Sequence, residues 1–309
     1  MGQKTPFIIT PELTAIAIAY KNKAMIADKV LPRVHVGTRS FKFTAYPIGE
    51  SFTVPDTKVG RKSKPNKVEF SATEQTASVD DYALDDDIPN DDILTAPANY
   101  DPKGNAVMQI TNLIELDREV RAANLVFNPA NYGSDKKIIL SGSSQFSDPT
   151  SDPIKIIMDA LDAMLMRPNV MTIGRAAFSA LIRHPKIVKA ILGNAGDSGI
   201  ARREDIAALF ELEEIAVGES FVNTARKGQA VNMQRVWGKH ISLIYRDVLA
   251  NNQSGTTFGF TAQYGDRVGM ELPDADIGMR GGITVRSGES VKELITAPDL
   301  GYFIQNVIA

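Results

Sequence analysis

Residues 52 to 79, FTVPDTKVGRKSKPNKVEFSATEQTASV, place the strongest constraint on the fold of this chain. They predict a hairpin: an outgoing strand, a tip rich in Pro, Gly and Lys, and a returning strand over residues 68 to 79. Just before them, FKFTAY alternates and places Phe41 and Phe43 on one side of a strand. An isolated two-stranded hairpin is marginal in water, and this sequence offers no third strand. The hairpin therefore needs another surface to lie on, which a neighbouring subunit could supply.

The hairpin tip carries a cluster of cations. Its basic residues are Lys58, Arg61, Lys62, Lys64 and Lys67. They could bind nucleic acid, but no aromatic residue lies among them to stack on a base, and a hairpin tip is not a helix that enters a groove. Two other interpretations are a solvated loop and a contact with an acidic surface on another copy of the chain. In such a contact, complementary charge would fix the register of the two copies.

An acidic stretch, DDYALDDDIPNDD, follows the hairpin closely. Its aspartates are Asp80, Asp81, Asp85, Asp86, Asp87, Asp91 and Asp92. They supply enough oxygen atoms for calcium, but the alternating acidic spacing and the central glycine of an EF-hand are missing. We interpret the stretch as a solvated or partner-facing acidic loop, and we expect no metal site there.

Composition is that of a folded protein without strong overall charge. The 309 residues are 43% hydrophobic and 23% charged, with a formal net charge of −3. This charge argues against coating nucleic acid through the overall field, although a local basic face stays open. The chain has no cysteine, which excludes disulfides and thiolate metal sites. No apolar run is long enough to span a membrane, and we read no signal peptide, so we expect synthesis in the cytoplasm.

Residues 103 to 127 predict one long helix. Asp101 is a plausible cap, Pro102 suits the first helical position, and apolar residues recur near the helical period. A compact α/β region follows. We expect its helices after Asp152, over residues 176 to 192 with a break at Pro185, and over 202 to 212; its strands are expected near residues 169 to 175, 213 to 223, 236 to 245 and 259 to 265. The tail, residues 283 to 308, predicts a closing hairpin, and the class is α+β.

Catalytic motifs are absent from the sequence. No phosphate-binding glycine loop, nucleophile elbow or zinc-binding H-E-x-x-H occurs. The three histidines, His35, His184 and His240, are far apart in sequence, and we expect structural or surface roles for them. We therefore expect no catalytic residues and no cofactor. A metal-dependent hydrolase that uses the acidic cluster is the weakest alternative.

The order of the parts resembles the major capsid proteins of tailed bacteriophages, which have the Hong Kong 97-type fold. The resemblance rests on an arm, a long hairpin with a charged tip, an acidic stretch, one long helix and a compact α/β region. Stretches whose amino-acid sequence resembles that of these capsid proteins occur over nearly the whole chain. They are MIADKVLPRVHV, VDDYALDDDIPNDD, ILSGSSQFSDPTSDP, MTIGRAAFSALIRHPKIVKAIL, EEIAVGESFVNTA and VWGKHISLIY.

The resemblance implies a division of the chain into capsid domains. It assigns residues 1–33 to an N-terminal arm, 34–78 to an extended loop over the adjacent subunit, 79–148 and 266–309 to a peripheral domain with a spine helix near 103–127, and 149–265 to an axial domain. Function would be self-assembly into hexamers and pentamers of an icosahedral shell in the virion, enclosing double-stranded DNA.

Further expectations about partners follow from the same resemblance. The shell would assemble in the cytoplasm of the host bacterium with a separate scaffolding protein, a portal and a decoration protein. Arg118 and Arg121 on the long helix are candidates for facing the DNA. Some family members form isopeptide crosslinks between a loop lysine and an asparagine of a neighbouring subunit. Lys62 or Lys64 would be the candidates here, but no matching partner is evident, so we expect a noncovalent shell. An encapsulin-like nanocompartment is the main alternative.

Overall fold

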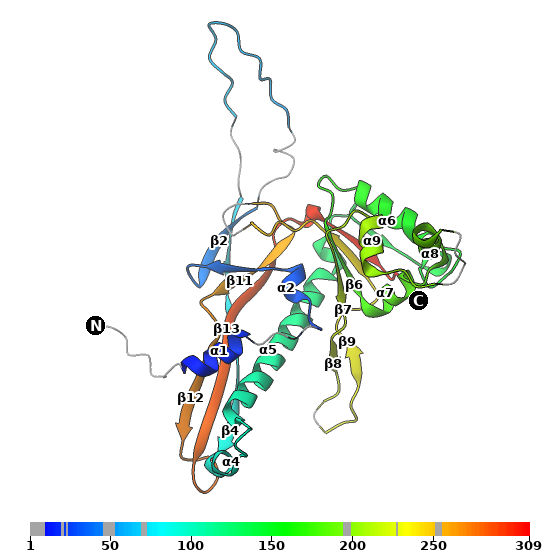
Figure 1. Ribbon diagram of the computed structural model, residues 1–309. Coiled ribbons are helices and arrows are strands. Elements are labelled where there is room, and N and C mark those ends of the chain that lie inside the picture. Colours follow the sequence, from blue (N-terminus) through cyan, green and yellow to red (C-terminus); the bar gives the residue numbers. More distant parts are fainter. Residues whose placement is uncertain are drawn as a thin grey trace.

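A computed structural model describes residues 10–19, 22, 24–45, 53–68, 73–193, 199–226, 228–250 and 255–309. Within these residues the chain forms two five-stranded sheets and two two-stranded ribbons, with helices against both large sheets (Figure 1). The predicted α+β class is confirmed. None of the helices in these residues combines the length and the apolar character that crossing a bilayer demands.

The first sheet is built around one long strand. Its members are β1 (Arg33–Val36), β4 (Asp80–Pro89), β11 (Gly259–Tyr264), β12 (Val268–Asp274) and β13 (Gly282–Ile295). β13 pairs antiparallel with β4, β11 and β12, while β1 pairs parallel with β11. Because β13 has fourteen residues, it can hold three partners along its length.

The long helix α5 (Pro102–Val126) packs on this sheet and confirms the predicted helix. The Asp101 carboxylate accepts the Lys103 backbone N–H at 3.1 Å, as expected for a cap. A shorter helix, α1 (Pro11–Ala19), contacts both α5 and β12. A Cβ at Gly269 would lie 2.7 Å from the Leu13 backbone, so this close approach requires glycine. Two further short helices are α2 (Ala27–Val30) and α4 (Asn90–Thr95).

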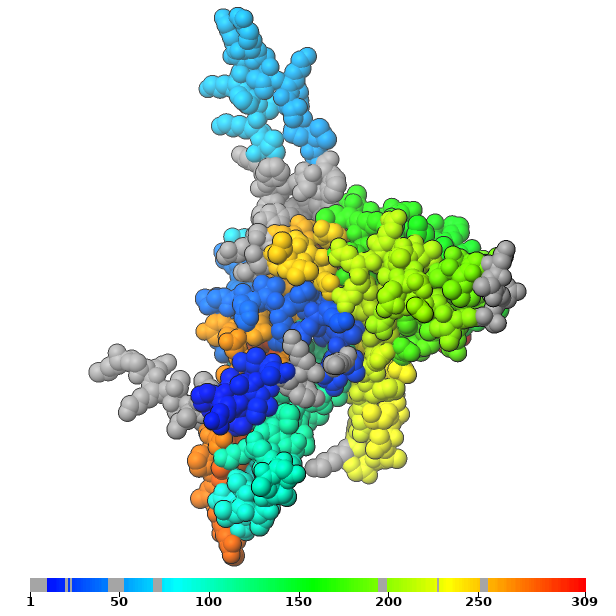
Figure 2. All heavy atoms as spheres, in the orientation of Figure 1, coloured from blue at the N-terminus to red at the C-terminus, as the bar shows by residue number. Residues whose placement is uncertain are grey.

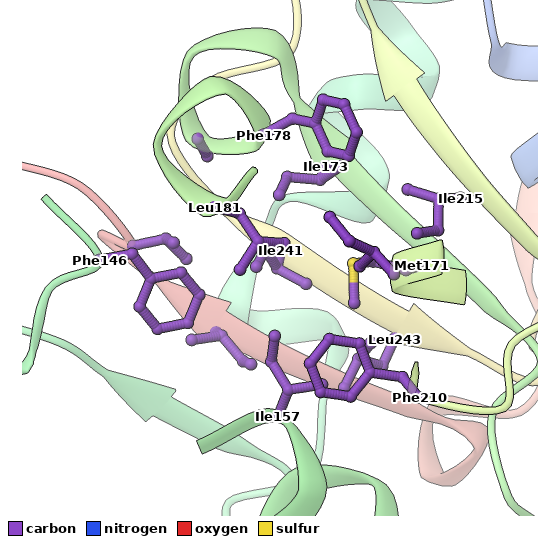
Figure 3. Close-up of a cluster of buried hydrophobic side chains, with 14 of the residues drawn as sticks. Phe146, Ile157, Met171, Ile173, Phe178, Leu181, Phe210, Ile215, Ile241 and Leu243 are labelled. Atoms are coloured by element: carbon purple, nitrogen blue, oxygen red, sulfur yellow. The ribbon is translucent and has the colours of Figure 1, made fainter. Parts of the chain in front are cut away.

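The second sheet forms the compact α/β region. Its strands, in spatial order, are β5 (Lys137–Ile139), β14 (Gly301–Gln305), β10 (Ile241–Ile244), β6 (Val170–Gly174) and β7 (Glu214–Gly218). Its helices are α6 (Pro153–Asp162), α7 (Arg175–Leu181), α8 (Pro185–Leu192) and α9 (Arg203–Leu209). Asp152 caps α6, and the helix break at Pro185 is confirmed. Figure 3 shows the core between them, where Ile157, Leu181 and Phe210 meet the sheet side chains Met171 and Leu243.

The predicted closing hairpin at residues 283 to 308 is wrong. β13 belongs to the first sheet, whereas β14 lies between β5 and β10 in the second. The chain turns between them at a short 3-10 helix, Pro298–Leu300, and then buries Phe303 and Ile304 completely. Ile304 packs in the core shown in Figure 3, and Phe303 packs in a separate cluster with Val126 and Trp237. This burial outweighs local pairing with β13. β5 and β14 therefore belong to the second sheet, and β11 belongs to the first.

Two of the three histidines hold backbone in place. His184 Nδ1 accepts the Lys186 backbone N–H at 3.3 Å and caps α8, while Nε2–H donates to the Asp148 carbonyl at 3.1 Å. His240 Nδ1 accepts the Asn306 N–H at 3.0 Å. Burial lowers the pKa of both His184 and His240. His35 lies exposed on β1.

Candidate assembly surface

A short ribbon holds the base of the charged hairpin. β2 (Ser40–Ala45) pairs antiparallel with β3 (Thr73–Ser78). Phe41 and Phe43 are buried, as their alternation predicts, and pack with Val79 and Phe260 of the first sheet. The hairpin therefore has an apolar root on its own subunit. The predicted strand pair is shorter than expected, because residues 53–68 have no strand conformation.

Residues 53–68, here called the basic loop, stand away from the body of the molecule (Figures 1 and 2). Every residue in this loop is exposed. A turn from Gly60 O to Ser63 N–H at 2.9 Å and a bond from Asn66 Nδ2 to Asp56 O at 2.9 Å shape it. The five cations predicted for the tip, Lys58, Arg61, Lys62, Lys64 and Lys67, all lie here. Among the described residues, no carboxylate lies within 4.0 Å of the side-chain nitrogen atoms of these five residues. The loop thus presents unneutralised positive charge to the solvent.

The expectation of an acidic loop is wrong: Asp91 and Asp92 lie in α4, and residues 80–89 before them form strand β4. It pairs with β13 over ten residues, and β13 supplies cations opposite its carboxylates. Lys292 Nζ lies 2.9 Å from Asp80, and Arg286 contacts both Asp85 oxygens at 2.6 Å. Charge complementarity across the two strands therefore overrides the low strand propensity of aspartate.

Other aspartates of the predicted acidic cluster are also bound within the chain. Asp81 pairs with Arg39 and accepts from Ser290, and these hydrogen bonds lower the pKa of Asp81. Asp87 accepts from Thr284 Oγ1 at 2.6 Å, and Asp91 lies 3.0 Å from Arg280. Asp86 and Asp92 have no basic partner within 4.0 Å in the described part of the chain. The structure therefore leaves only part of this cluster free to face a partner.

No metal site emerges from the described residues. They contain no group of three or more His, Asp or Glu side chains placed to hold an ion. A surface hollow of about 370 Å³ is lined by Arg33, Glu115 and Arg267. Glu115 and Arg267 already form an ion pair with each other at 2.7 Å. These two charged side chains of the hollow are thus already neutralised by each other.

Arg118 and Arg121, the candidates for facing DNA, both make contacts within the subunit. Arg118 is only 2% exposed; its guanidinium contacts Asp28 at 2.7 Å and Thr261 Oγ1 at 3.0 Å. Arg121 lies 3.6 Å from the Tyr82 ring centroid and 3.0 Å from Glu293. Both side chains join the spine helix to the first sheet, so neither presents its charge to a phosphate.

Sequence reasoning missed Glu119, a buried carboxylate on α5. It is fully buried and accepts hydrogen bonds from Ile26 N–H at 2.9 Å, Ala27 N–H at 2.8 Å and Trp237 Nε1–H at 2.6 Å. Ser220 Oγ adds a fourth at 3.3 Å. Burial raises the pKa of Glu119 despite these donors. The sequence pattern could have revealed it, because Glu119 lies on the same face of the predicted helix as the apolar residues that are buried.

Glu289 is a second buried carboxylate, with two arginine partners. Its side chain is 1% exposed and lies 2.7 Å from Arg33 and 2.9 Å from Arg267. Burial by itself would raise the pKa of Glu289, but these two cations outweigh it and hold the pKa below the usual 4.5. Within the first sheet, the ion pairs join Arg33 of β1 and Arg267 to β13.

We expect the unassembled subunit to lose stability as the pH falls below about 4.5, because the unfolded chain then binds a proton at residue 289 before the native state does. Above that pH the contribution from Glu289 is complete, and it is lost as the pH falls through the folded-state pKa. Urea unfolding at several pH values measures the effect. The Glu289→Gln variant should be less stable near neutral pH and should show a flatter decline in acid. A decline as steep as that of the wild type would contradict the assignment.

Comparison with known proteins decides the family. Residues 130–247 match the family model for phage major capsid protein E. The major capsid protein of Pseudomonas phage JBD67 is 56% identical to this chain over 304 residues, which cover 98% of each protein. This chain belongs to the phage major capsid proteins. The crystal structure of a phage-related protein from Bordetella bronchiseptica RB50 matches the capsid protein with a TM-score of 0.77 and 25% identity, covering 97% of this chain and 98% of that one.

A solved phage capsid supports the fold assignment. The capsid of cyanophage P-SCSP1u matches 99% of this capsid protein and 92% of its own chain, with a TM-score of 0.57 at 11% identity. The Hong Kong 97-type fold expected from the resemblance is thereby confirmed. The capsid protein has a structural, shell-forming role in the virion. Identity of 56% to a phage protein over nearly the full length supports a phage shell over the encapsulin-like alternative.

Proposed function

We propose that this capsid protein builds hexamers and pentamers of a noncovalent icosahedral shell, in which the basic loop of each subunit lies on the adjacent subunit. The single observation that carries the proposal is the basic loop itself. It is sixteen exposed residues of projecting chain whose five cations form no ion pair with the described residues, and it is attached through a ribbon whose apolar root is already buried. A segment of this kind gains stability only by contact with another molecule.

The charge distribution supports a second copy as that molecule. The basic loop carries a formal charge of +4. Since the whole chain carries −3, all other residues together carry −7. Asp86 and Asp92 on and after β4 add acidic side chains without a basic partner among the described residues. Opposite charges on loop and body favour association in one register.

The proposal includes the wider setting of the shell. The shell encloses double-stranded DNA without reading its sequence, assembles in the host bacterial cytoplasm, and uses a separate scaffolding protein, a portal and a decoration protein. The subunit carries out no catalysis. The absence of familiar catalytic motifs from the sequence supports this part of the proposal.

Electron microscopy of the purified protein, followed by denaturing gels of the same particles, tests the proposal. We expect closed shells of uniform diameter that dissociate into intact monomers on boiling in detergent, because neither Lys62 nor Lys64 has an evident crosslinking partner. A subunit that stays monomeric at high concentration, even with the other head proteins present, would contradict assembly. A ladder of covalent oligomers from well-formed shells would contradict only the noncovalent part.

A further inference from the structure

A second projecting hairpin, residues 221–235, has no role in the function proposed above. It consists of β8 (Phe221–Asn223) and β9 (Met233–Arg235), which pair only with each other in the described chain. Figures 1 and 2 show it standing out from the compact α/β region as a separate arm. Two strands alone are marginal in water, so the arm needs either internal bracing or a partner.

The base of the hairpin is firmly fixed to its own subunit. Val236 N–H donates to Ser220 O at 3.1 Å, and the next residue, Trp237, is fully buried with its indole N–H on Glu119. A Cβ at Gly218 would lie 2.2 Å from the Trp237 ring, so glycine is required there. The hairpin is therefore presented in a set direction from the body.

The turn of the hairpin is also ordered by hydrogen bonds. Thr224 N–H donates to Asn232 O at 3.0 Å, and Asn232 N–H donates to the Asn223 side chain at 3.0 Å. Arg226 O accepts the Gln229 N–H at 3.0 Å. Because hydrogen bonds hold the hairpin at its base and near its turn, binding of a partner should cost little conformational entropy.

One face of the hairpin is apolar and exposed. Phe221 lies opposite Arg235, and Asn223 lies opposite Met233, so these side chains share a face. Phe221 is 43% exposed and Met233 is 53% exposed; Val231, two residues earlier in the same alternation, is 71% exposed. The Arg235 guanidinium lies 4.4 Å from the Phe221 ring centroid. An aromatic ring beside an arginine on an exposed apolar face is typical of the centre of a protein interface.

The hairpin also carries positive charge without compensation. Residues 221–235 contain three cations and no acidic residue, giving +3. Neither Arg226 nor Arg235 has a carboxylate within 4.0 Å in the described residues. The formal charge of the whole chain is −3. Since the basic loop contributes +4 and this hairpin +3, all other residues together carry −10. The rest of the chain is thus acidic overall, so a second copy offers charge opposite to that of the hairpin.

We propose that the hairpin 221–235 is a second intersubunit clasp, which seats its Phe221, Val231 and Met233 face on the acidic body of a neighbouring copy. This inference rests on the shell-forming role of the chain. A second copy suits the hairpin better than DNA does, because phosphates would satisfy the cations but leave the three apolar side chains exposed to water.

Three glutamate substitutions in the purified full chain test the clasp. Met233→Glu and Val231→Glu place a charge on the apolar face at exposed positions, so the subunit should keep its wild-type thermal unfolding. Gln234→Glu is the matched control, since it adds the same charge on the opposite face of the same strand. Sedimentation measures the fraction of protein in shells, and DNA content is measured in particles recovered from infected cells.

We expect the two apolar-face variants to form shells at a level at least about tenfold lower than the wild type, as is usual when an interface centre is disrupted, and the control to stay within about twofold. Wild-type shell yield from both apolar-face variants would overturn the clasp. So would normal shells with reduced DNA, which would place the hairpin on the genome. If the wild type itself forms no shells, the proposed function fails; if only basic-loop variants fail to assemble, the clasp alone is wrong.

Discussion

Replacement of both Lys62 and Lys64 by glutamate is expected to abolish shell assembly while the subunit stays folded. The double substitution lowers the formal charge of the basic loop from +4 to zero. Both side chains are fully exposed and make no ion pair in the described subunit, so folding should be unaffected. At an intersubunit contact, by contrast, two reversed charges meet an acidic surface, and like-charge contacts cost several kcal/mol. At about 3 kcal/mol per contact, association falls by more than about 100-fold.

The matched control keeps the charge. Lys62→Arg with Lys64→Arg should assemble at the wild-type level, whereas the glutamate pair should remain as free subunits or small oligomers in gel filtration and electron microscopy. Thermal unfolding of both variants should match that of the unassembled wild type. Normal shells from the glutamate pair would show that the loop charge does not contribute to subunit contact.

Replacement of Glu119 by alanine is expected to cause the largest loss of subunit stability. The substitution leaves the N–H groups of Ile26 and Ala27 and the Trp237 indole buried without their acceptor. Each unsatisfied buried donor costs about 1–3 kcal/mol, so a total of about 3–5 kcal/mol is expected after partial relaxation. Because Glu119 holds α5, the segment before α2 and the base of the hairpin 221–235 together, these elements should lose protection from hydrogen exchange together.

Denaturant unfolding of the unassembled subunit measures the effect, and Asp117 provides the control. Asp117 lies two residues away on the same helix with its side chain 57% exposed and paired with Arg121. Asp117→Ala should change stability by less than about 1 kcal/mol, as for other exposed ion pairs. Equal effects of the two substitutions would mean that Glu119 does not link the three elements.

Local signals predicted many of the helices and strands correctly. Asp101 and Pro102 mark the start of α5, and Pro185 breaks the chain between α7 and α8, because capping and the missing proline N–H act within one turn. The alternation of Phe41 and Phe43 gave the buried face of β2 for the same reason. These features depend on neighbours close in sequence.

The errors arose where distant residues decide the outcome. β4 is rich in aspartate and resembles a loop until Arg286 and Lys292, some two hundred residues later, lie opposite it. Arg118 is a charged residue, and its sequence neighbours give no sign that it is buried. Contacts with Asp28 and Thr261, which are distant in sequence, hold it inside the subunit. β14 follows β13 in sequence but joins the other sheet, where Phe303 and Ile304 are buried in two separate apolar clusters. No local pattern encodes such long-range pairing.

The candidate assembly surface was predictable in part. The five cations of the basic loop stand out in sequence, and their exposure followed from the polar tip. The hairpin 221–235 gave no comparable signal, because its apolar face alternates with polar residues over only a few positions. Its importance depends on the direction in which Trp237 and Gly218 hold it, which only the fold reveals.

A cryo-electron microscopy reconstruction of the assembled shell tests the central claim most directly, since it locates residues 53–68 relative to the subunits around them. We expect density for Lys62 and Lys64 within ion-pair distance of acidic side chains on the adjacent subunit. A basic loop that lies in solvent, or that folds back onto its own subunit in a well-resolved shell, would contradict the claim.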